Sequence, residues 1–210
     1  PVASIRLLVD TLLDPARTDL VETREYLELI SKENKRLGYL IDNFLSFSRM
    51  ERNKSSFDQR PVDPIQVVSS AEDLFRERFK ETSFQLQTDC ETNLNPIMGD
   101  PDALITALGN LLENAIKYGG TQPNIAIRVQ AAHSGIQFSV EDKGQGIPLS
   151  DQKKIFRKFY QGKKNPASHP GGVGLGLSIV AFIVSKHSGH IEVKSEVGIG
   201  SCFTLIIPYA

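Results

Sequence analysis

The clearest helical pattern in the sequence is PDALITALGNLLENAIKY, residues 101–118. Asp100 and Pro101 open it as an N-cap residue and a proline at the first helical position. Steps of four, three and four residues give one apolar stripe, which consists of Leu104, Leu108, Leu111 and Ala115. Because a stripe of this kind is buried against a core, the sequence predicts a helix that packs on the rest of a domain and ends near Tyr118.

Polar side chains form a second stripe on the same helix. Asn110, Asn114 and Lys117 follow each other at steps of four and three, so they share one face. Carboxamide oxygens are ligands for a hard cation such as Mg²⁺, and a lysine on the same face can contact phosphate oxygens. Glu113 lies beside them and is placed to act as a base. Taken alone, the stripe is explained equally well as the solvated face of the helix.

The first of three glycine clusters is Asp142-Lys143-Gly144-Gln145-Gly146, which follows an apolar alternation that ends at residue 140. An acidic side chain at a strand end can accept a hydrogen bond from an exocyclic amine such as that of adenine. The glycines let the backbone approach a flat ring closely. The same residue types also make ordinary turns, so this cluster is a weak signal by itself.

The second cluster is GGVGLG at residues 171–176, and it leads directly into a helical pattern. Free backbone amides and the positive end of a helix dipole make an anion site suited to phosphate. The glycine spacing and the lack of a preceding strand exclude a dinucleotide-binding fingerprint, and no Gly-Lys-Ser/Thr loop is present. The third cluster, residues 198–201, precedes the last strand and by itself favours a plain hairpin turn.

The remaining pattern from residue 55 onward mixes helices and strands. We predict helices over about 64–80, 101–118 and 174–187, and strands near 84–88, 125–129, 136–140, 191–193 and 203–207. Asp63-Pro64 caps the first helix, and Ser134-Gly135 is the turn of a hairpin. The predicted fold class is therefore α+β, with a mixed sheet covered on one face by helices.

The first 54 residues have a different pattern. Residues 2–13 are an amphipathic helix, Asp14-Pro15 breaks it, and residues 18–52 keep heptad spacing with Asn34 in one seam position. Two such helices make an antiparallel hairpin that pairs with a second copy into a four-helix bundle, or a long helix lies on a domain. A polar linker near residue 55 divides the chain into domains 1–54 and 55–210.

Composition limits the class of protein. Hydrophobic residues make up 40% and charged residues 23% of the 210 residues, as in soluble globular proteins. The net charge of −1 favours neither nucleic acid nor an anionic membrane as a partner. Cys90 and Cys202 lie far apart, which fits a reducing cytoplasmic compartment. No apolar run reaches the roughly 20 residues that cross a bilayer, and no secretory leader opens the chain. Because the chain begins inside a helical pattern, we expect a fragment.

Five motifs in a fixed order resemble the histidine kinase branch of the gyrase, chaperone and histidine kinase ATPase superfamily. They lie at residues 111–118, 142–148, 155–160, 172–178 and 195–201. The predicted hairpin in front is similar to the dimerisation domain of sensor histidine kinases of two-component systems, so the resemblance covers nearly the whole chain. It implies a protein histidine kinase that binds ATP and Mg²⁺ and catalyses in-line phosphoryl transfer.

The resemblance also implies roles for individual residues. Asn114, assisted by Asn110, would hold Mg²⁺, Glu113 would be the base on the acceptor imidazole, and Asp142 would receive the adenine amine. The nucleotide-binding residues implied are Asn110, Asn114, Lys117, Tyr118, Asp142, Gly144, Gly146, Ile147, Lys158, Phe159, Gly172, Gly174, Leu175, Gly176, Leu177 and Thr204.

Residues 147–171 lack periodicity and are rich in cations: Lys153, Lys154, Arg157, Lys158, Lys163 and Lys164, with Asp151 as the single acid. The family's mobile lid over the triphosphate has this place, and closure would enclose the phosphates. Many relatives carry arginine where this chain has Gln161, so Lys158 or Lys163 would replace it. A solvated basic loop is the alternative interpretation.

The family's phosphorylated histidine lies in His-Glu-x-x-x-Pro, and Pro1 to Arg6 resemble the stretch that begins with this proline. We therefore expect the acceptor about five residues ahead of Pro1, and this polypeptide to bind and hydrolyse ATP without phosphorylating itself. Expected partners are a second copy, through residues 1–54, and a response regulator receiver domain; membrane anchoring of the full-length protein is left open.

The alternatives are an ATP-binding pseudokinase that acts as a conformational switch, and a chaperone or topoisomerase-type ATPase. His133 is expected in solvent, and the His187–His190 pair is not expected to bind metal.

Overall fold

The structure is a computed structural model that describes residues 2–13, 22–31, 33–34, 37–38, 41, 57–81, 84–120, 124–162 and 174–209. The chain forms two compact units, Pro1–Arg49 and Met50–Ala210, each of which is described by itself. The domain division at residues 54 and 55 stays a prediction.

The first unit is helical in all its described parts except the turn residue Leu13. Helix α1 (Val2–Leu12) confirms the first predicted helix, and none of its residues is buried within the single chain. The second predicted helix is helical at all its described residues, 22–31, 33–34, 37–38 and 41. The predicted break between the two helices, Asp14-Pro15, lies outside the described residues. Among the described helices, none is long and apolar enough to span a bilayer.

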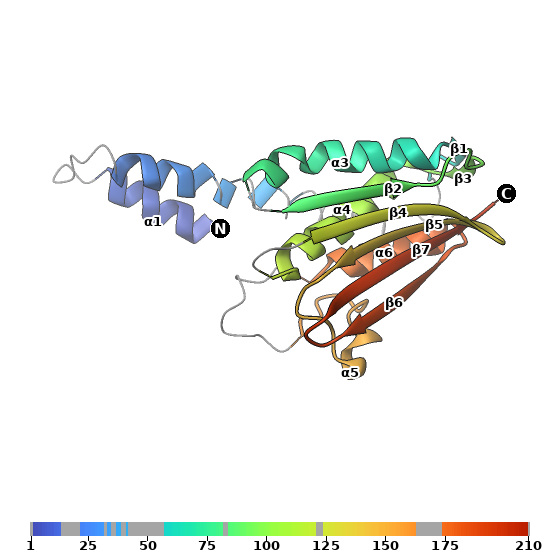
Figure 1. The fold of residues 1–210 in the computed structure, drawn as a ribbon. Helices are drawn as coiled ribbons and strands as arrows, with labels where there is room; N and C mark the ends of the chain where they lie inside the picture. The colour runs from blue at the N-terminus through green and yellow to red at the C-terminus, as the bar shows by residue number, and fades with distance from the viewer. Residues whose placement is uncertain are drawn as a thin grey trace. The chain divides into compact units, whose positions relative to one another are not determined.

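The second unit contains a five-stranded mixed sheet in the order β2-β4-β5-β7-β6 (Figure 1). Its strands are β2 (Gln85–Cys90), β4 (Asn124–Ala132), β5 (Gly135–Asp142), β6 (His190–Glu196) and β7 (Gly200–Pro208). Strand β2 is parallel to β4, and the other neighbours are antiparallel. A separate pair consists of β1 (Arg60–Val62) and β3 (Ile97–Gly99). These two strands were not predicted, because three residues are too few to give an alternating pattern.

Helices α3 (Pro64–Glu81), α4 (Pro101–Tyr118) and α6 (Gly176–Lys186) cover one face of the sheet (Figure 1). Both predicted N-caps are confirmed. The Ile65 N–H donates to Asp63 Oδ1 at 2.9 Å, and the Ala103 N–H donates to Asp100 Oδ1 at 3.1 Å. A further single turn, α5 (Leu149–Gln152), follows β5 and was not predicted.

The core lies between the sheet and the helices. Alternate strand residues point inward and are at most 5% exposed: Ile125, Ile127, Val129, Ile136, Phe138, Val140, Phe203, Leu205 and Ile207. The helices contribute the predicted stripe of α4 and, from α6, Ile179, Val180, Ile183 and Val184. Each large side chain stabilises the fold by about 1.5–3 kcal/mol through burial. This packing confirms the predicted α+β class and fixes α4 between the sheet and its neighbouring helices.

The other face of the sheet is polar. Arg128 Nη1 lies 2.6 Å from Glu141 Oε2, and Gln130 Nε2 donates to Gln137 Oε1 at 3.0 Å. His133 is exposed in the turn between β4 and β5, as predicted. Within the described part of the second unit, no helix covers this face, so its side chains are not part of the core (Figure 1).

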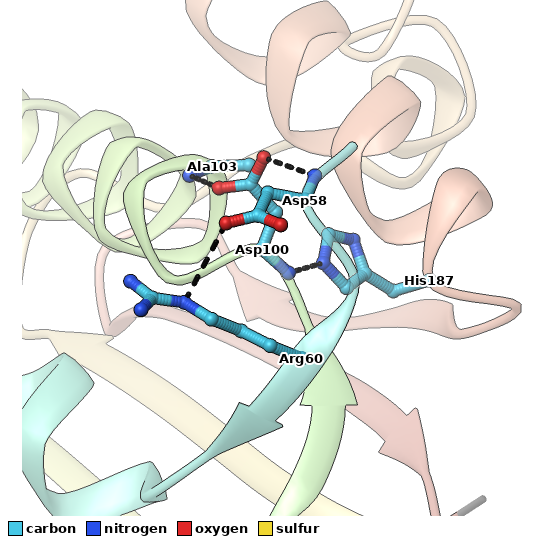
Figure 2. A network of polar contacts seen from close by, with 5 residues as sticks. All are labelled: Asp58, Arg60, Asp100, Ala103 and His187. Carbon is cyan, nitrogen blue, oxygen red and sulfur yellow. Dashed lines mark hydrogen bonds and ion pairs between the residues drawn. The ribbon is translucent and has the colours of Figure 1, made fainter. Parts of the chain in front are cut away.

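A polar network around the buried His187 joins the start of the second unit to the N-terminus of α4 and the C-terminus of α6 (Figure 2). His187 is 4% exposed, and its Nε2 accepts the Asp100 N–H at 2.9 Å. Its Nδ1 lies 2.7 Å from the Ile183 carbonyl oxygen, so Nδ1 carries the proton of a neutral imidazole. Asp100 Oδ2 accepts the Asp58 N–H at 3.1 Å. Nε2 therefore joins the C-terminus of α6 to the N-terminus of α4, while Nδ1 bonds the last turn of α6 itself.

Candidate functional site

The polar stripe of α4 begins at Asn110, which is 3% exposed although it is polar. Its Nδ2 donates to the Thr106 carbonyl oxygen at 2.9 Å. Its Oδ1 lies against the first residue of α6, since a Cβ added at Gly176 would be 2.9 Å from this oxygen. Glycine at 176 therefore lets the N-terminus of α6 approach the stripe more closely than another residue could.

Asn114 carries the one clear polar deficiency on this helix. Its Nδ2 is buried and has no hydrogen-bond partner in the described part of the chain. A buried amide without a partner costs about 1–3 kcal/mol, and such exceptions call for a specific explanation. Because the two ends of a carboxamide look alike, rotation would place its oxygen at the same position. A bound ligand or cation at Asn114 would satisfy the amide.

Lys117 and Tyr118 end the stripe. Lys117 Nζ lies 4.8 Å from the centroid of the Tyr118 ring, and Tyr118 is partly exposed. Glu113 is half-buried one residue before Asn114. The structure thus brings a cation and an aromatic ring to the end of α4, while the role of Glu113 as a base stays a prediction.

Asp142 ends strand β5 and is only 7% exposed. Its Oδ1 accepts the Gly144 N–H at 2.9 Å. Burial raises the pKa of its carboxyl group, and backbone hydrogen bonds from Gly144 and Ser201 oppose that rise. A buried carboxylate whose pKa is raised by its site is a common mark of a functional residue.

Glycines bring the loop after Asp142 onto α4 and β6. A Cβ at Gly144 would lie 2.0 Å from the Tyr118 carbonyl oxygen, and one at Gly146 would lie 1.9 Å from that of Glu196. The Gln145 N–H also donates to the Tyr118 oxygen at 3.2 Å. The loop and the end of α4, which are predicted separately from sequence, therefore form one continuous site.

The third glycine cluster is more than a plain turn. A Cβ at Gly200 would lie 2.1 Å from the Asp142 carbonyl oxygen, and Gly200 has φ of 142°. Strand β7 pairs Ser201 with Asp142 in register. The cluster therefore supports the backbone on which Asp142 sits, and this contact is tertiary and has no signal in the local sequence.

Phe159 and Gly174 join the basic segment to the N-terminus of α6. Phe159 has φ of 61°, which is strained for a bulky residue, and its N–H donates to the Gly174 oxygen at 2.9 Å. Gly174 has φ of 76°, and an added Cβ would lie 2.8 Å from the Phe159 carbonyl carbon. Helix α6 therefore begins at Gly176, two residues later than predicted.

The other residues of this segment are mostly exposed. Lys153, Lys154, Arg157, Lys158 and Phe159 are all exposed, and Phe159 is 63% exposed. Leu175 is buried, and Leu177 is half-buried in the first turn of α6. Gly172, Lys163 and Lys164 lie outside the described residues, so their predicted roles stay predictions.

Thr204 is not brought to the site. Side chains alternate along β7, so residues 201, 203 and 205 share the helix-covered face and residue 204 points to the other face. The Thr204 hydroxyl lies 3.0 Å from Ser139 Oγ on that polar face. Ser201, which is 7% exposed, is the residue of β7 that lies beside Asp142 in the strand register.

Two residues without a predicted role complete the site. The Ile147 N–H donates to Ser195 Oγ at 2.7 Å, and Gln152 Nε2 donates to the Ile147 oxygen at 3.0 Å. Ser195 lies inside the last of the five motifs, whereas Gln152 has no sequence signal, because its partners are distant in the chain or belong to the backbone.

Known families match both units. Residues 99–210 match the family described as "Histidine kinase-, DNA gyrase B-, and HSP90-like ATPase", and residues 1–53 match "His Kinase A (phospho-acceptor) domain". The sensor-like histidine kinase SenX3 of Mycobacterium tuberculosis is 34% identical over 99% of this chain and 50% of its own length. The circadian input-output histidine kinase CikA of Synechococcus elongatus is 34% identical over 99% of this chain and 28% of its own length. The chain thus spans about half the length of SenX3.

Solved structures have the same fold. Full-length ShkA in complex with AMPPNP has a TM-score of 0.74 at 25% identity, covering 99% of this chain and 43% of its own. Histidine kinase ThkA in complex with response regulator protein TrrA has a TM-score of 0.73 at 21% identity, covering 99% of this chain and 58% of its own. The second likeness shows the fold alone.

Proposed function

Because the chain belongs to the histidine kinase-, DNA gyrase B- and HSP90-like ATPase family, we propose that it is the catalytic region of a sensor histidine kinase, binding Mg·ATP and transferring the γ-phosphoryl group to a histidine. The family matches confirm the resemblance predicted from the five motifs. The domains proposed are residues 1–54 for dimerisation and 55–210 for nucleotide binding.

One observation carries the proposal: the unpaired amide of Asn114 lies on the helix whose end is packed by the loop of buried Asp142. A base bound by Asp142 would then have its phosphates near the polar stripe of α4. The ionised carboxylate would accept the hydrogen bond of the adenine amine, and Tyr118 would lie against the ring. The loop of Asp142 would thus recognise the base, and the neighbouring polar stripe of α4 would bind the phosphates.

The donor set fits Mg²⁺. Asn110 and Asn114 offer carboxamide oxygens, which are hard ligands. The buried end of the Asn114 carboxamide has no hydrogen-bond partner in the described part of the chain, so a ligand can occupy that position. When bound, the cation would neutralise charge that develops on the phosphates. Lys117 would contact phosphate oxygens, as would the backbone amides that open α6 at Gly174 and Gly176. Lys158 and Phe159 belong to the segment that would close over them.

The acceptor and the partners belong to the same proposal. All four histidines lie beyond residue 53, so the proposed acceptor precedes Pro1 in the whole protein. Dimerisation through residues 1–54 is supported by the phospho-acceptor domain match and by the exposed apolar side chains of α1. A response regulator receiver domain would take the phosphoryl group next. The cytoplasmic location stays a prediction.

The experiment is transfer of radiolabelled γ-phosphate in the longer protein that includes the residues before Pro1. The expected label is acid-labile, as for phosphohistidine. Glu113→Gln should reduce labelling by at least about 100-fold with ATP affinity nearly unchanged, because it removes only the base. A longer protein that binds Mg·ATP and incorporates no label would contradict the kinase activity and favour a conformational switch.

A further inference from the structure

We propose that Gln152 and Ser195 form a clamp on the backbone of Ile147 that positions the nucleotide-binding loop, residues 143–148. The proposal rests on the proposed function and adds two positioning residues to it. Neither side chain is placed on the nucleotide itself. Both act through the loop that follows Asp142.

The clamp consists of three hydrogen bonds. The Ile147 N–H donates to Ser195 Oγ at 2.7 Å. Gln152 Nε2 donates to the Ile147 carbonyl oxygen at 3.0 Å and to the Ser195 carbonyl oxygen at 2.9 Å. Ile147 lies outside the helices and strands, so no ladder is there to pair its backbone. The side chains of Ser195 and Gln152 therefore pair the backbone N–H and carbonyl oxygen of Ile147, as a neighbouring strand would in a sheet.

The Ser195 hydroxyl carries the clamp to Asp142. It donates to the Gly200 carbonyl oxygen at 2.9 Å and lies 3.0 Å from Ser201 Oγ, while it accepts from Ile147. These bonds use one donor and two acceptor positions, which is all that a hydroxyl has. Ser201 in turn donates its backbone N–H to the Asp142 carboxylate. A continuous set of hydrogen bonds thus runs from Gln152 to the buried acid.

Gln152 also fixes the point at which the basic segment leaves the domain. It ends α5, a helix of four residues that has no buried residue and no side-chain cap. Leu149 at its start is 84% exposed, so burial does little to hold this turn. One donor of the Gln152 amide therefore anchors α5 to β6 at Ser195, and the other anchors it to the loop at Ile147. Glutamate lacks both donors at neutral pH, and methionine lacks them at every pH.

The test is titration of the whole 210-residue chain with Mg·ATP by isothermal calorimetry. Gln152→Met should weaken binding about tenfold, because two hydrogen bonds that order the loop are lost. The matched control is Gln130→Met, which removes a comparable amide bond on the polar face of the sheet and should leave affinity unchanged. Equal affinities for the parent and both methionine variants would overturn the clamp and leave the proposed function standing.

Two further variants separate positioning from simple loss of folding. Gln152→Glu should weaken binding at neutral pH, and the ratio of its Kd to the parent's should fall as pH is lowered toward about 5, because a protonated carboxyl regains one donor. Ser195→Ala should weaken binding, and Ser195→Thr should restore it by keeping the hydroxyl. A ratio that does not change with pH, or a threonine no better than alanine, would count against the clamp. A parent that fails to bind Mg·ATP would instead defeat the proposed function, and the clamp with it.

Discussion

Helices α4 and α6 connect two buried polar clusters that differ in one respect. At the first, around His187, both ring nitrogens and the Asp100 carboxylate have partners within the chain (Figure 2). At the second, Asn114 keeps an unpaired amide and Asp142 keeps a carboxyl group whose pKa is raised by burial. Each cluster contains a polar side chain that is almost fully buried, His187 at 4% and Asp142 at 7% exposed, so burial alone does not tell the two clusters apart.

The difference teaches how to distinguish structural from functional polar groups. A buried group that is satisfied by the chain itself stabilises the fold, and nothing needs to be added to it. A buried group that stays unsatisfied costs stability unless a ligand completes it, which is the expected pattern at a binding site. The His187 cluster should therefore matter for folding, and the Asn114–Asp142 cluster should matter for binding.

The largest expected effect is on binding at Asp142. Asp142→Asn replaces an acceptor by a group that presents a donor to the adenine amine, so Mg·ATP affinity should fall about 100-fold. The free energy of unfolding at neutral pH should be unchanged or higher, because a buried charge is removed. Calorimetric titration and urea unfolding measure the two quantities. Asp89→Asn, at an exposed position of β2, is the control.

The pH dependence of stability gives the sign of the Asp142 contribution. Burial raises the pKa of this carboxyl in the folded chain, so the folded state binds more protons than the unfolded state between the ordinary and the raised pKa. The free energy of unfolding should therefore decrease as pH rises through that window. In Asp142→Asn, the part of this decrease that comes from Asp142 should disappear. If the free energy of unfolding of the variant varied with pH as it does in the parent, the decrease could not be assigned to Asp142.

The second expected effect is on folding at His187. His187→Ala removes two buried hydrogen bonds and leaves a cavity beside Phe57, whose ring centroid lies 5.5 Å from that of the imidazole. Unfolding free energy should fall by about 3 kcal/mol, while Mg·ATP affinity of the folded protein stays within about twofold. His190→Ala, at an exposed residue of β6, should change neither quantity. A large loss of affinity without loss of stability would break the comparison.

A smaller effect is expected at Asn114. Asn114→Ala deletes an unpaired amide, so unfolding free energy should change by less than about 1 kcal/mol. Mg·ATP affinity should fall about tenfold, and the remaining affinity should depend less on Mg²⁺ than that of the parent. Titrations with and without EDTA measure this. Asn124→Ala, at the exposed start of β4, is the matched control, and equal Mg²⁺ dependence in parent and Asn114→Ala would exclude Asn114 as a ligand.

The smallest effect is expected on the uncovered face of the sheet. Arg128 and Glu141 form an ion pair at 2.6 Å, but both side chains are substantially exposed. Arg128→Ala should change unfolding free energy by about 0.5 kcal/mol and leave nucleotide affinity unchanged. Strong effects on binding would show that the site extends to this face, where Thr204 also lies.

Local signals predicted most of the helices. The α4 boundaries and both N-caps were right because capping residues and a four-three-four apolar stripe act within one helix. The β4–β5 hairpin was right for a similar reason, since alternation and a turn are neighbours in sequence. Strands β1 and β3 were missed because pairing between residues far apart in sequence, such as Arg60 with Gly99, leaves no local pattern.

The site was predicted in its parts and not in its connections. Asn110, Asn114 and Asp142 were selected from residue type and spacing, and their roles in binding stay predictions. Thr204 was selected without a facing, and its hydroxyl lies beside Ser139 on the polar face, because a motif alone does not say which residues of β7 point inward. Ser195 and Gln152 were missed since their partners come from other segments. Side-chain clamps of this kind depend on tertiary contacts.

Hydrogen–deuterium exchange with and without Mg·ATP tests the central contrast most directly. If the incomplete cluster is the nucleotide site, added Mg·ATP should slow exchange at residues 144–147 and at the start of α6, with little change around Asp58 and Asp100. Protection centred on the His187 cluster, or no protection anywhere, would contradict the assignment of binding to Asn114 and Asp142.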